Sequence, residues 1–147
     1  MNYIAYGSNM NARQMACRCP GAKLLGTGRL PGAKLSFYVH ATVESSRIKG
    51  AYVPVACWEI SPANEKLLDS YEGHPNYYVK EIRTVQMDDG RMITGMIYIM
   101  NLKRAGLPSR DYFHGILSAY HALGLGSDIK KVLEPALTRA LRHGGPA

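Results

Sequence analysis

Hydrophobic and polar positions alternate along much of the N-terminal part of the chain, a pattern that predicts β-strands. Asn2–Tyr6 is one such run, and residues 22–39 contain two more, joined by a turn at Pro31–Gly32. Tyr52–Ile60 is rich in β-branched and aromatic residues and predicts another strand. Residues 41–51 have few apolar anchors, so we expect a mobile loop there, a kind of segment that can border a site.

A hairpin is expected later in the chain, where Asp89–Gly90 is a strong two-residue turn signal. It joins a run that contains Tyr78, Ile82 and Val85 to the apolar run Met92–Met100. About six strands and one early helix are therefore expected. The short connections favour an α+β fold, in which a small mixed barrel-like sheet of about six strands is flanked by short helices.

A short amphipathic helix is predicted between Ser61 and Gly73. Ser61 is a suitable N-cap, and Pro62 follows at the first helical position. Three apolar residues at helical spacing form a stripe: Leu67, Leu68 and Tyr71. Gly73 suits the left-handed turn that ends a helix.

Helical periodicity returns after residue 108. Ser109 can cap a helix that Gly124 ends, and Ser127 can cap a second one. Pro135 lacks an amide donor, so it should kink or restart that second helix. Residues 143–147 are expected to be a frayed tail.

The length and composition predict one domain over residues 1–147. A chain of 147 residues with 46% apolar residues can bury about two thirds of its unfolded surface in a single core. The net charge of +7 would suit nucleic acid, but the basic residues are scattered and form no basic run. We therefore expect no nucleic-acid partner.

The cysteines and the N-terminus predict a reduced, cytoplasmic protein. The three cysteines are an odd number, and Cys17 and Cys19 lack the two-residue spacer of a zinc or thioredoxin-type pair. No basic segment followed by a long apolar core opens the chain, and no apolar run reaches membrane-spanning length. We expect no membrane partner.

Two stretches are candidates for chemistry. Gly7, Ser8 and Asn9 follow the first strand and precede a helix expected from about Asn11 to Cys17. Their consecutive amides can form a nest for negative charge, although a plain strand-to-helix connection has the same pattern. Glu72 precedes Gly73 at the end of a helix, where it is either a catalytic carboxylate or an ordinary last-turn residue.

Other catalytic classes find little support. The five histidines are spread out, no His/Cys/Asp set has metal spacing, and we expect neither a metal nor a cofactor. A Gly-x-Ser-x-Gly elbow is absent, which argues against a serine hydrolase.

Three motifs in order give the chain a recognisable pattern: Tyr6-Gly-Ser-Asn9 after the first strand, Leu68-Asp-Ser-Tyr-Glu72-Gly73 with Tyr78 and Lys80 following, and Pro108-Ser-Arg-Asp-Tyr112 with Gly124-Leu125 downstream. Together they resemble the γ-glutamylcyclotransferase superfamily over nearly the whole chain. The resemblance implies the γ-glutamylcyclotransferase-like fold. It also implies a small-molecule γ-glutamyl substrate.

The resemblance also implies roles for particular residues. In that superfamily the glutamate before glycine is the general acid/base, which here is Glu72. The turn after the first strand forms the bottom of the pocket, and tyrosines beside it hold the glutamyl group. Carried over, the turn residues are Tyr6, Gly7, Ser8 and Asn9. The pocket tyrosines are Tyr78 and Tyr112, with Tyr77 an alternative to Tyr78 as the inward residue.

The implied reaction releases 5-oxoproline, because the α-amine of the substrate attacks its own γ-carbonyl. The substrate can be a γ-glutamyl amino acid, a γ-glutamyl amine or a γ-glutamyl group on a biosynthetic intermediate, and the sequence does not choose among them. The competing hypothesis is a non-catalytic binding module for an anionic metabolite or nucleic acid. A carboxylate at position 72 favours the enzyme, because an anion binder gains nothing from a negative charge in its pocket.

Overall fold

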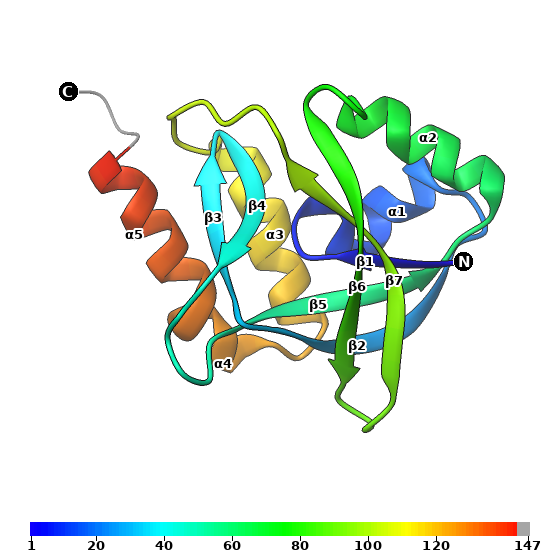
Figure 1. Ribbon diagram of the computed structural model, residues 1–147, viewed down its shortest axis with the longest axis horizontal. Coiled ribbons are helices and arrows are strands. Elements are labelled where there is room, and N and C mark those ends of the chain that lie inside the picture. The colour runs from blue at the N-terminus through cyan, green and yellow to red at the C-terminus, as the bar shows by residue number, and fades with distance from the viewer. Residues whose placement is uncertain (144–147) are drawn as a thin grey trace.

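The computed structural model describes residues 1–143, and Figure 1 shows its ribbon. The strands are β1 (Asn2–Ala5), β2 (Lys23–Pro31), β3 (Ala33–Tyr38), β4 (His40–Ser45), β5 (Tyr52–Glu59), β6 (Tyr78–Met87) and β7 (Met92–Met100). The helices are α1 (Ala12–Arg18), α2 (Pro62–Glu72), α3 (Arg110–Ala122), α4 (Gly126–Asp128) and α5 (Glu134–His143). A 3₁₀ turn, η1 (Ser8–Met10), precedes α1, and a π-helical turn, η2 (Ile129–Leu133), precedes α5.

Five strands form a closed barrel in the order β1-β5-β2-β6-β7. Neighbouring strands of the barrel pair antiparallel, with one exception. The strands β1 and β7, which close the barrel, pair in parallel, with Tyr3 opposite Met96. Side chains from several strands fill the interior, among them the fully buried Val55, Val85 and Ile97. The predicted α+β fold with a mixed barrel-like sheet is confirmed, but the seven strands within residues 1–143 divide into a five-stranded barrel and a separate two-stranded sheet instead of one sheet of about six.

The turn at Pro31–Gly32 takes the chain out of the barrel. The two strands predicted around it are present, but β2 pairs with β5 and β6, whereas β3 pairs with β4 in a separate two-stranded sheet. In Figure 1 this small sheet lies beside α5, at the opposite side of the molecule from α2. The chain thus builds a barrel and a second sheet next to it.

The expectation of a mobile loop at residues 41–51 is wrong for the first half of this segment. Residues 40–45 form β4, which pairs with β3 at every position, and Ala41, Thr42 and Val43 are buried. The Thr42 hydroxyl accepts a hydrogen bond from the Met100 amide at 3.0 Å. Few large apolar residues are needed there, because small side chains and backbone pairing hold the strand against its neighbours.

The helix predicted after Ser61 is confirmed as α2. The Ser61 side chain accepts from the Asn64 amide, Pro62 begins the helix, and Gly73 ends it with a φ of 64°. The predicted stripe is partly wrong: Leu68 is fully buried, but Leu67 and Tyr71 are 50% and 48% exposed. The helix lies across one end of the barrel, so only a narrow part of its surface is covered.

The C-terminal helices follow the prediction less closely. Ser109 caps α3, as expected, and Gly124 follows it with a φ of 74°. Ser127 caps nothing, because α4 already begins at Gly126 and places Ser127 inside the helix. Pro135 is the second residue of α5, directly after the π-helical turn, so the expected restart occurs there. His143 ends α5, and the rest of the predicted tail, residues 144–147, lies outside the described residues.

Among residues 1–143, no helix is both long enough and apolar enough to cross a membrane.

Candidate active site

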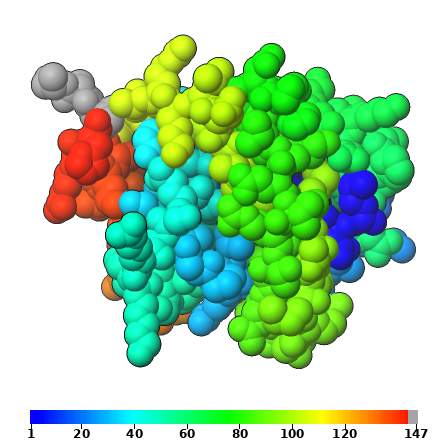
Figure 2. Space-filling model, viewed as in Figure 1, coloured from blue at the N-terminus to red at the C-terminus, as the bar shows by residue number. Residues whose placement is uncertain are grey.

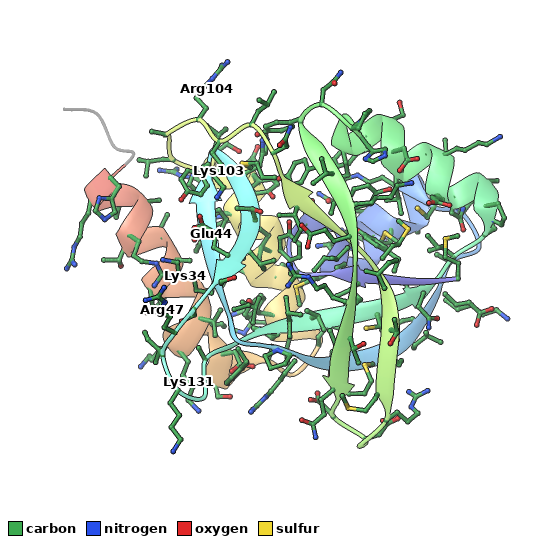
Figure 3. The ribbon with its side chains drawn as sticks, in the orientation of Figure 1. Lys34, Glu44, Arg47, Lys103, Arg104 and Lys131 are labelled. Atoms are coloured by element: carbon green, nitrogen blue, oxygen red, sulfur yellow. The ribbon has the colours of Figure 1, made fainter. Side chains whose placement is uncertain are left out.

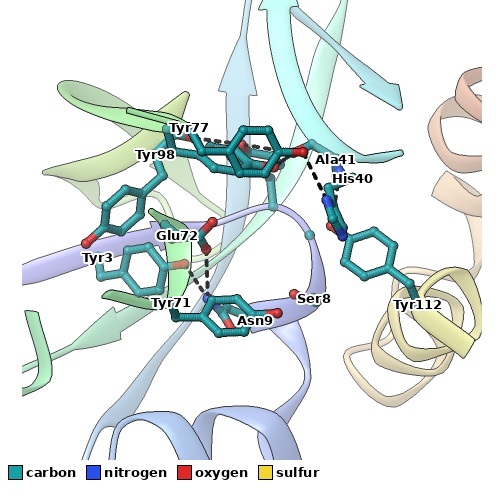
Figure 4. Close-up of a pocket in the computed structure, with 13 residues that line it drawn as sticks. Tyr3, Ser8, Asn9, His40, Ala41, Tyr71, Glu72, Tyr77, Tyr98 and Tyr112 are labelled. Carbon is teal, nitrogen blue, oxygen red and sulfur yellow. Dashed lines mark hydrogen bonds between the residues drawn. The ribbon is translucent and has the colours of Figure 1, made fainter. Parts of the chain in front are cut away.

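A cavity of about 240 Å³ lies where β1 leaves the barrel, and Figure 4 shows it in close-up. Its lining combines the Gly7–Asn9 backbone turn, Glu72 from the end of α2, and His40 and Ala41 from the start of β4. Seven of the ten tyrosines complete it: Tyr3, Tyr6, Tyr71, Tyr77, Tyr78, Tyr98 and Tyr112. The seven residues predicted as site residues therefore all line one cavity.

Glu72 reaches the cavity because α2 ends there. Gly73 adopts the left-handed conformation, so the chain turns back toward β6 directly after the carboxylate. Lys80 on β6 holds the helix, with its ammonium 2.7 Å from Glu65 and 3.1 Å from Asp69. The Tyr98 hydroxyl also donates to Asp69, at 2.6 Å. These contacts tie α2 to two barrel strands and so position its last residue.

The surroundings of Glu72 favour its neutral form more than water does. Burial raises the pKa of Glu72 to about 7, and the Arg18 guanidinium lowers it in part. The side-chain amide of Asn9 donates to a Glu72 oxygen at 3.5 Å. A carboxyl group with a pKa near neutrality can accept a proton and return it during one reaction.

Six tyrosines around Glu72 remain protonated. Burial is the largest cause that raises their pKa values, and the charge of Glu72 adds to it: Tyr3, Tyr6, Tyr77, Tyr78, Tyr98 and Tyr112. Their hydroxyl groups can thus donate hydrogen bonds at neutral pH. The cavity combines one acidic group with apolar ring surfaces and several hydroxyl groups.

The Gly7–Asn9 turn is held from both sides. The Arg18 guanidinium donates to the Ser8 hydroxyl at 3.2 Å and to the Asn9 side-chain oxygen. The Trp58 indole donates to the Asn9 carbonyl at 3.0 Å. A side chain at Gly7 would meet the Ala41 Cβ at 3.3 Å, so glycine lets β4 come close. The turn opens η1, and the first amides of a helical turn have no acceptor within it.

Tyr78 and Tyr112 meet at Ala41. The Tyr78 hydroxyl donates to the Ala41 carbonyl at 2.6 Å, and the Tyr112 hydroxyl accepts from the Ala41 amide at 3.0 Å. Tyr78 is 5% exposed, whereas Tyr77 is half-buried and hydrogen-bonds through its hydroxyl to His40 Nδ1 at 3.0 Å. Both tyrosines line the cavity, so the alternatives left open by the sequence are both part of the site.

Five lining residues were not predicted: Tyr3, His40, Ala41, Tyr71 and Tyr98. A sixth, Tyr77, was predicted only as the alternative to Tyr78. Tyr3 and Tyr98 lie on adjacent barrel strands, and their rings pack edge-to-face at 5.9 Å. A correct strand order would have brought them together, but the pattern of residues alone did not supply it. His40 carried no local signal at all, because it reaches the cavity only through the β3–β4 pairing.

Tyr71 has a different role from the predicted apolar stripe. The Arg18 guanidinium lies over its ring, 3.5 Å from the centroid, and also donates to its hydroxyl. Arg18 therefore links the Gly7–Asn9 turn to the last turn of α2.

Within residues 1–143, no three His, Cys, Asp or Glu side chains are grouped so that they could hold a metal ion.

Comparison with known proteins agrees with this geometry. The family described as "Gamma-glutamyl cyclotransferase, AIG2-like" matches residues 3–114. The chain belongs to this family. The matched stretch contains the barrel strands except Asn2, the first residue of β1, and it contains all seven predicted site residues.

The individual proteins that the chain resembles are distant relatives. The gamma-glutamylcyclotransferase of Mus musculus is 28% identical over 148 residues, which cover 90% of this chain and 78% of the mouse protein. A solved gamma-glutamyl cyclotransferase superposes with a TM-score of 0.79 at 27% identity, covering 89% of this chain and 84% of that one. The uncharacterized protein loc79017 from Homo sapiens gives a TM-score of 0.77 at 26% identity, covering 88% and 83%.

Proposed function

We propose that the chain is a γ-glutamyl cyclotransferase that forms 5-oxoproline from a γ-glutamyl amino acid or γ-glutamyl amine. Family membership supports the reaction class. The observation that carries the proposal is the position of Glu72, whose carboxyl group has a pKa of about 7 and lies in the tyrosine-lined cavity with the Gly7–Asn9 turn.

The reaction needs no external nucleophile. The α-amine of the glutamyl group attacks its own γ-carbonyl, a C–N bond forms to close the five-membered ring, and the original amide C–N bond breaks. The α-amine loses a proton, and the leaving nitrogen gains one. Glu72 can take the first proton as general base and return the second as general acid, a contribution of about 10²- to 10⁴-fold.

The negative charge that develops on the carbonyl oxygen needs hydrogen-bond donors. Gly7, Ser8 and Asn9 line the cavity. Their backbone amides are suitable donors, and each such donor is worth about 3–4 kcal/mol in the transition state. The Tyr3 and Tyr112 hydroxyl groups accept hydrogen bonds from the Asn9 side chain and the Ala41 amide, so each still has its own proton to donate to the rest of the glutamyl group. By holding that group folded, the cavity also favours the geometry of attack.

The size of the cavity agrees with a small substrate group. Its volume of about 240 Å³ is below the range of about 300–1,000 Å³ for pockets that take drug-sized ligands. A single glutamyl group would occupy it, with the leaving amine toward the open side. The competing binding-module hypothesis has no comparable support here, because a partly ionised carboxylate in the cavity would repel an anion.

The test is to incubate the protein with γ-glutamyl amino acids, γ-glutamyl amines and ε-(γ-glutamyl)-lysine and to measure 5-oxoproline release. Turnover of at least one class is expected. The absence of 5-oxoproline from every compound, together with salt-sensitive retention of the protein on an oligonucleotide, would support the binding module instead.

Arg18 gives a second test of the same site. In Arg18→Gln the turn and α2 lose their link, so we expect kcat/KM to fall by about 10- to 100-fold. The positive charge that lowers the pKa of Glu72 is also lost, so the acid limb of the kcat/KM profile should move to higher pH.

The matched control is Arg13→Gln, on the same helix but exposed to solvent, which should leave both the rate and the pH profile unchanged. Arg18→Lys keeps the charge and should restore the position of the acid limb better than the rate. A lower rate with an unmoved acid limb in Arg18→Gln would show that Arg18 does not act on Glu72.

A further inference from the structure

A second concave surface lies far from the catalytic cavity, at the base of the β3–β4 sheet. It has a volume of about 280 Å³ and is bordered by β3, the loop of residues 46–51, η2 and α5. Its charged lining residues are all basic: Lys34, Lys49, Lys131 and Arg139. Figure 3 shows Lys34, Arg47 and Lys131 gathered on this side of the molecule.

The cations of this surface lack acidic partners. None of the ion pairs within residues 1–143 includes Lys34, Arg47, Lys49 or Lys131. The neighbouring carboxylate on β4, Glu44, is already paired with Lys103 at 2.8 Å. Like charges around one hollow repel each other, and an anionic partner would relieve that repulsion.

The loop of residues 46–51 projects from the same surface and carries an exposed apolar tip. Ile48 is 76% exposed and lies between Arg47 and Lys49. In Figure 2 the loop forms the teal projection at the lower left of this face.

Hydrogen bonds hold this loop in a defined turn. The Ile48 amide donates to the Ser46 hydroxyl at 3.3 Å, and the Ala51 amide donates to the Ile48 carbonyl at 3.1 Å. Gly50, with a φ of 79°, supplies the left-handed position that such a turn requires. The apolar side chain is thus displayed at a fixed place between two cations.

Contrary to the expectation from the sequence that there is no membrane partner, we propose that this surface docks the protein on an anionic lipid bilayer. Ile48 enters the headgroup layer, and the Lys and Arg side chains contact lipid phosphates and carboxylates. An apolar residue flanked by cations matches the chemistry of that interface, which offers apolar depth and negative surface charge together.

Single-stranded nucleic acid is a poorer match to the same features. Base recognition on such proteins relies on exposed aromatic rings. Tyr52 lines the hollow, but the Arg29 guanidinium covers its ring at 4.0 Å from the centroid. Nucleic acid would also leave the exposed Ile48 unexplained.

Docking in this orientation leaves the catalytic cavity open. His40 and Ala41 lie at one end of the β3–β4 hairpin, and the loop of residues 46–51 lies at the other. Six residues of strand separate the two ends, a length of about 20 Å. Lipid binding at this surface can therefore be tested whether or not the cavity has the proposed cyclotransferase activity.

The test is co-sedimentation of the full chain with phosphatidylcholine vesicles, with and without phosphatidylserine, at low and high salt. We expect binding only when phosphatidylserine is present, and weaker binding at high salt. Replacing both Lys34 and Lys49 with Gln should weaken binding about 25-fold, at about fivefold for each charge. Ile48→Ser should weaken it by about fivefold.

Matched variants elsewhere on the surface serve as controls. Ile82 on β6 is 70% exposed, so Ile82→Ser removes an equally exposed isoleucine outside the surface. Replacing both Lys23 and Lys66 with Gln removes the same charge outside it. Thermal melting checks that every variant is folded.

The outcomes separate the alternatives. Binding that falls in the Lys34/Lys49 and Ile48 variants and stays constant in the controls supports the proposal. The proposal is overturned if phosphatidylserine vesicles do not bind, or if the Lys23/Lys66 variant weakens binding as much as the Lys34/Lys49 variant. It is also overturned if Ile48→Ser has no effect while an oligonucleotide competes, because the surface would then bind polyanions in general.

Discussion

Replacing Glu72 with glutamine should reduce the kcat for 5-oxoproline release by about 10²- to 10⁴-fold. The amide keeps the shape of the side chain and its contact with Asn9, but it cannot accept a proton from the substrate ammonium. The measurement is steady-state turnover of whichever γ-glutamyl compound the wild-type protein uses. Turnover that survives the substitution would remove Glu72 from the mechanism.

The pH dependence of kcat/KM in the wild-type protein should also show that Glu72 acts as the base. Because the base must be ionised, kcat/KM should fall as pH drops through the pKa of Glu72, about 7. An ordinary exposed glutamate would place that limb near its reference pKa of about 4.3. A profile that stays flat down to pH values near the reference would show that burial does not raise the pKa as the structure indicates.

Stability distinguishes lost chemistry from lost folding in the glutamine variant. The folded-state pKa of Glu72 is raised, so the protonated form stabilises the fold at low pH, and that stability is lost as pH rises through about 7. Above that pH the neutral glutamine should therefore raise the free energy of unfolding by roughly 1–3 kcal/mol. At about pH 4 the variant and the wild type should be equal in urea denaturation.

The sequence predicted those parts of the site that depend on neighbouring residues. Ser61, Pro62 and Gly73 mark the ends of α2, and the position of Glu72 beside Gly73 follows from them. The glycine turn after β1 was equally visible, because a strand followed by Gly-Ser-Asn has few local structures available. These signals act over a few residues, so one sequence is enough to interpret them.

The rest of the site depends on contacts between distant segments. Ala41 becomes a site residue because β4 pairs with β3 and brings its backbone to Tyr78 and Tyr112. The pairing is not encoded by a run of large apolar residues, so the sequence pattern of residues 41–51 predicts a loop. His40 is brought to Tyr77 by the same pairing, 37 positions apart in the sequence.

A large stability loss from a single methyl group is expected for Gly95→Ala. Gly95 is buried on β7, where the parallel β1–β7 pair closes the barrel. A Cβ there would lie 2.6 Å from the Asn2 carbonyl oxygen and 3.0 Å from its carbonyl carbon. These are backbone atoms of β1, so relief requires the two strands to separate at the point of closure. We expect the free energy of unfolding to fall by about 3 kcal/mol, measured by urea denaturation.

Gly115→Ala is the matched control, because Gly115 lies inside α3 and a Cβ there meets only the Gln14 side chain, at 3.9 Å. It should raise stability by about 0.5–1 kcal/mol, as alanine does in a helix interior. Because β1 runs directly into the Gly7–Asn9 turn, Gly95→Ala should also lower kcat/KM under conditions in which the variant remains folded. Equal stability of the two alanine variants would show that β1 and β7 can separate at little cost, and that barrel closure does not position the turn.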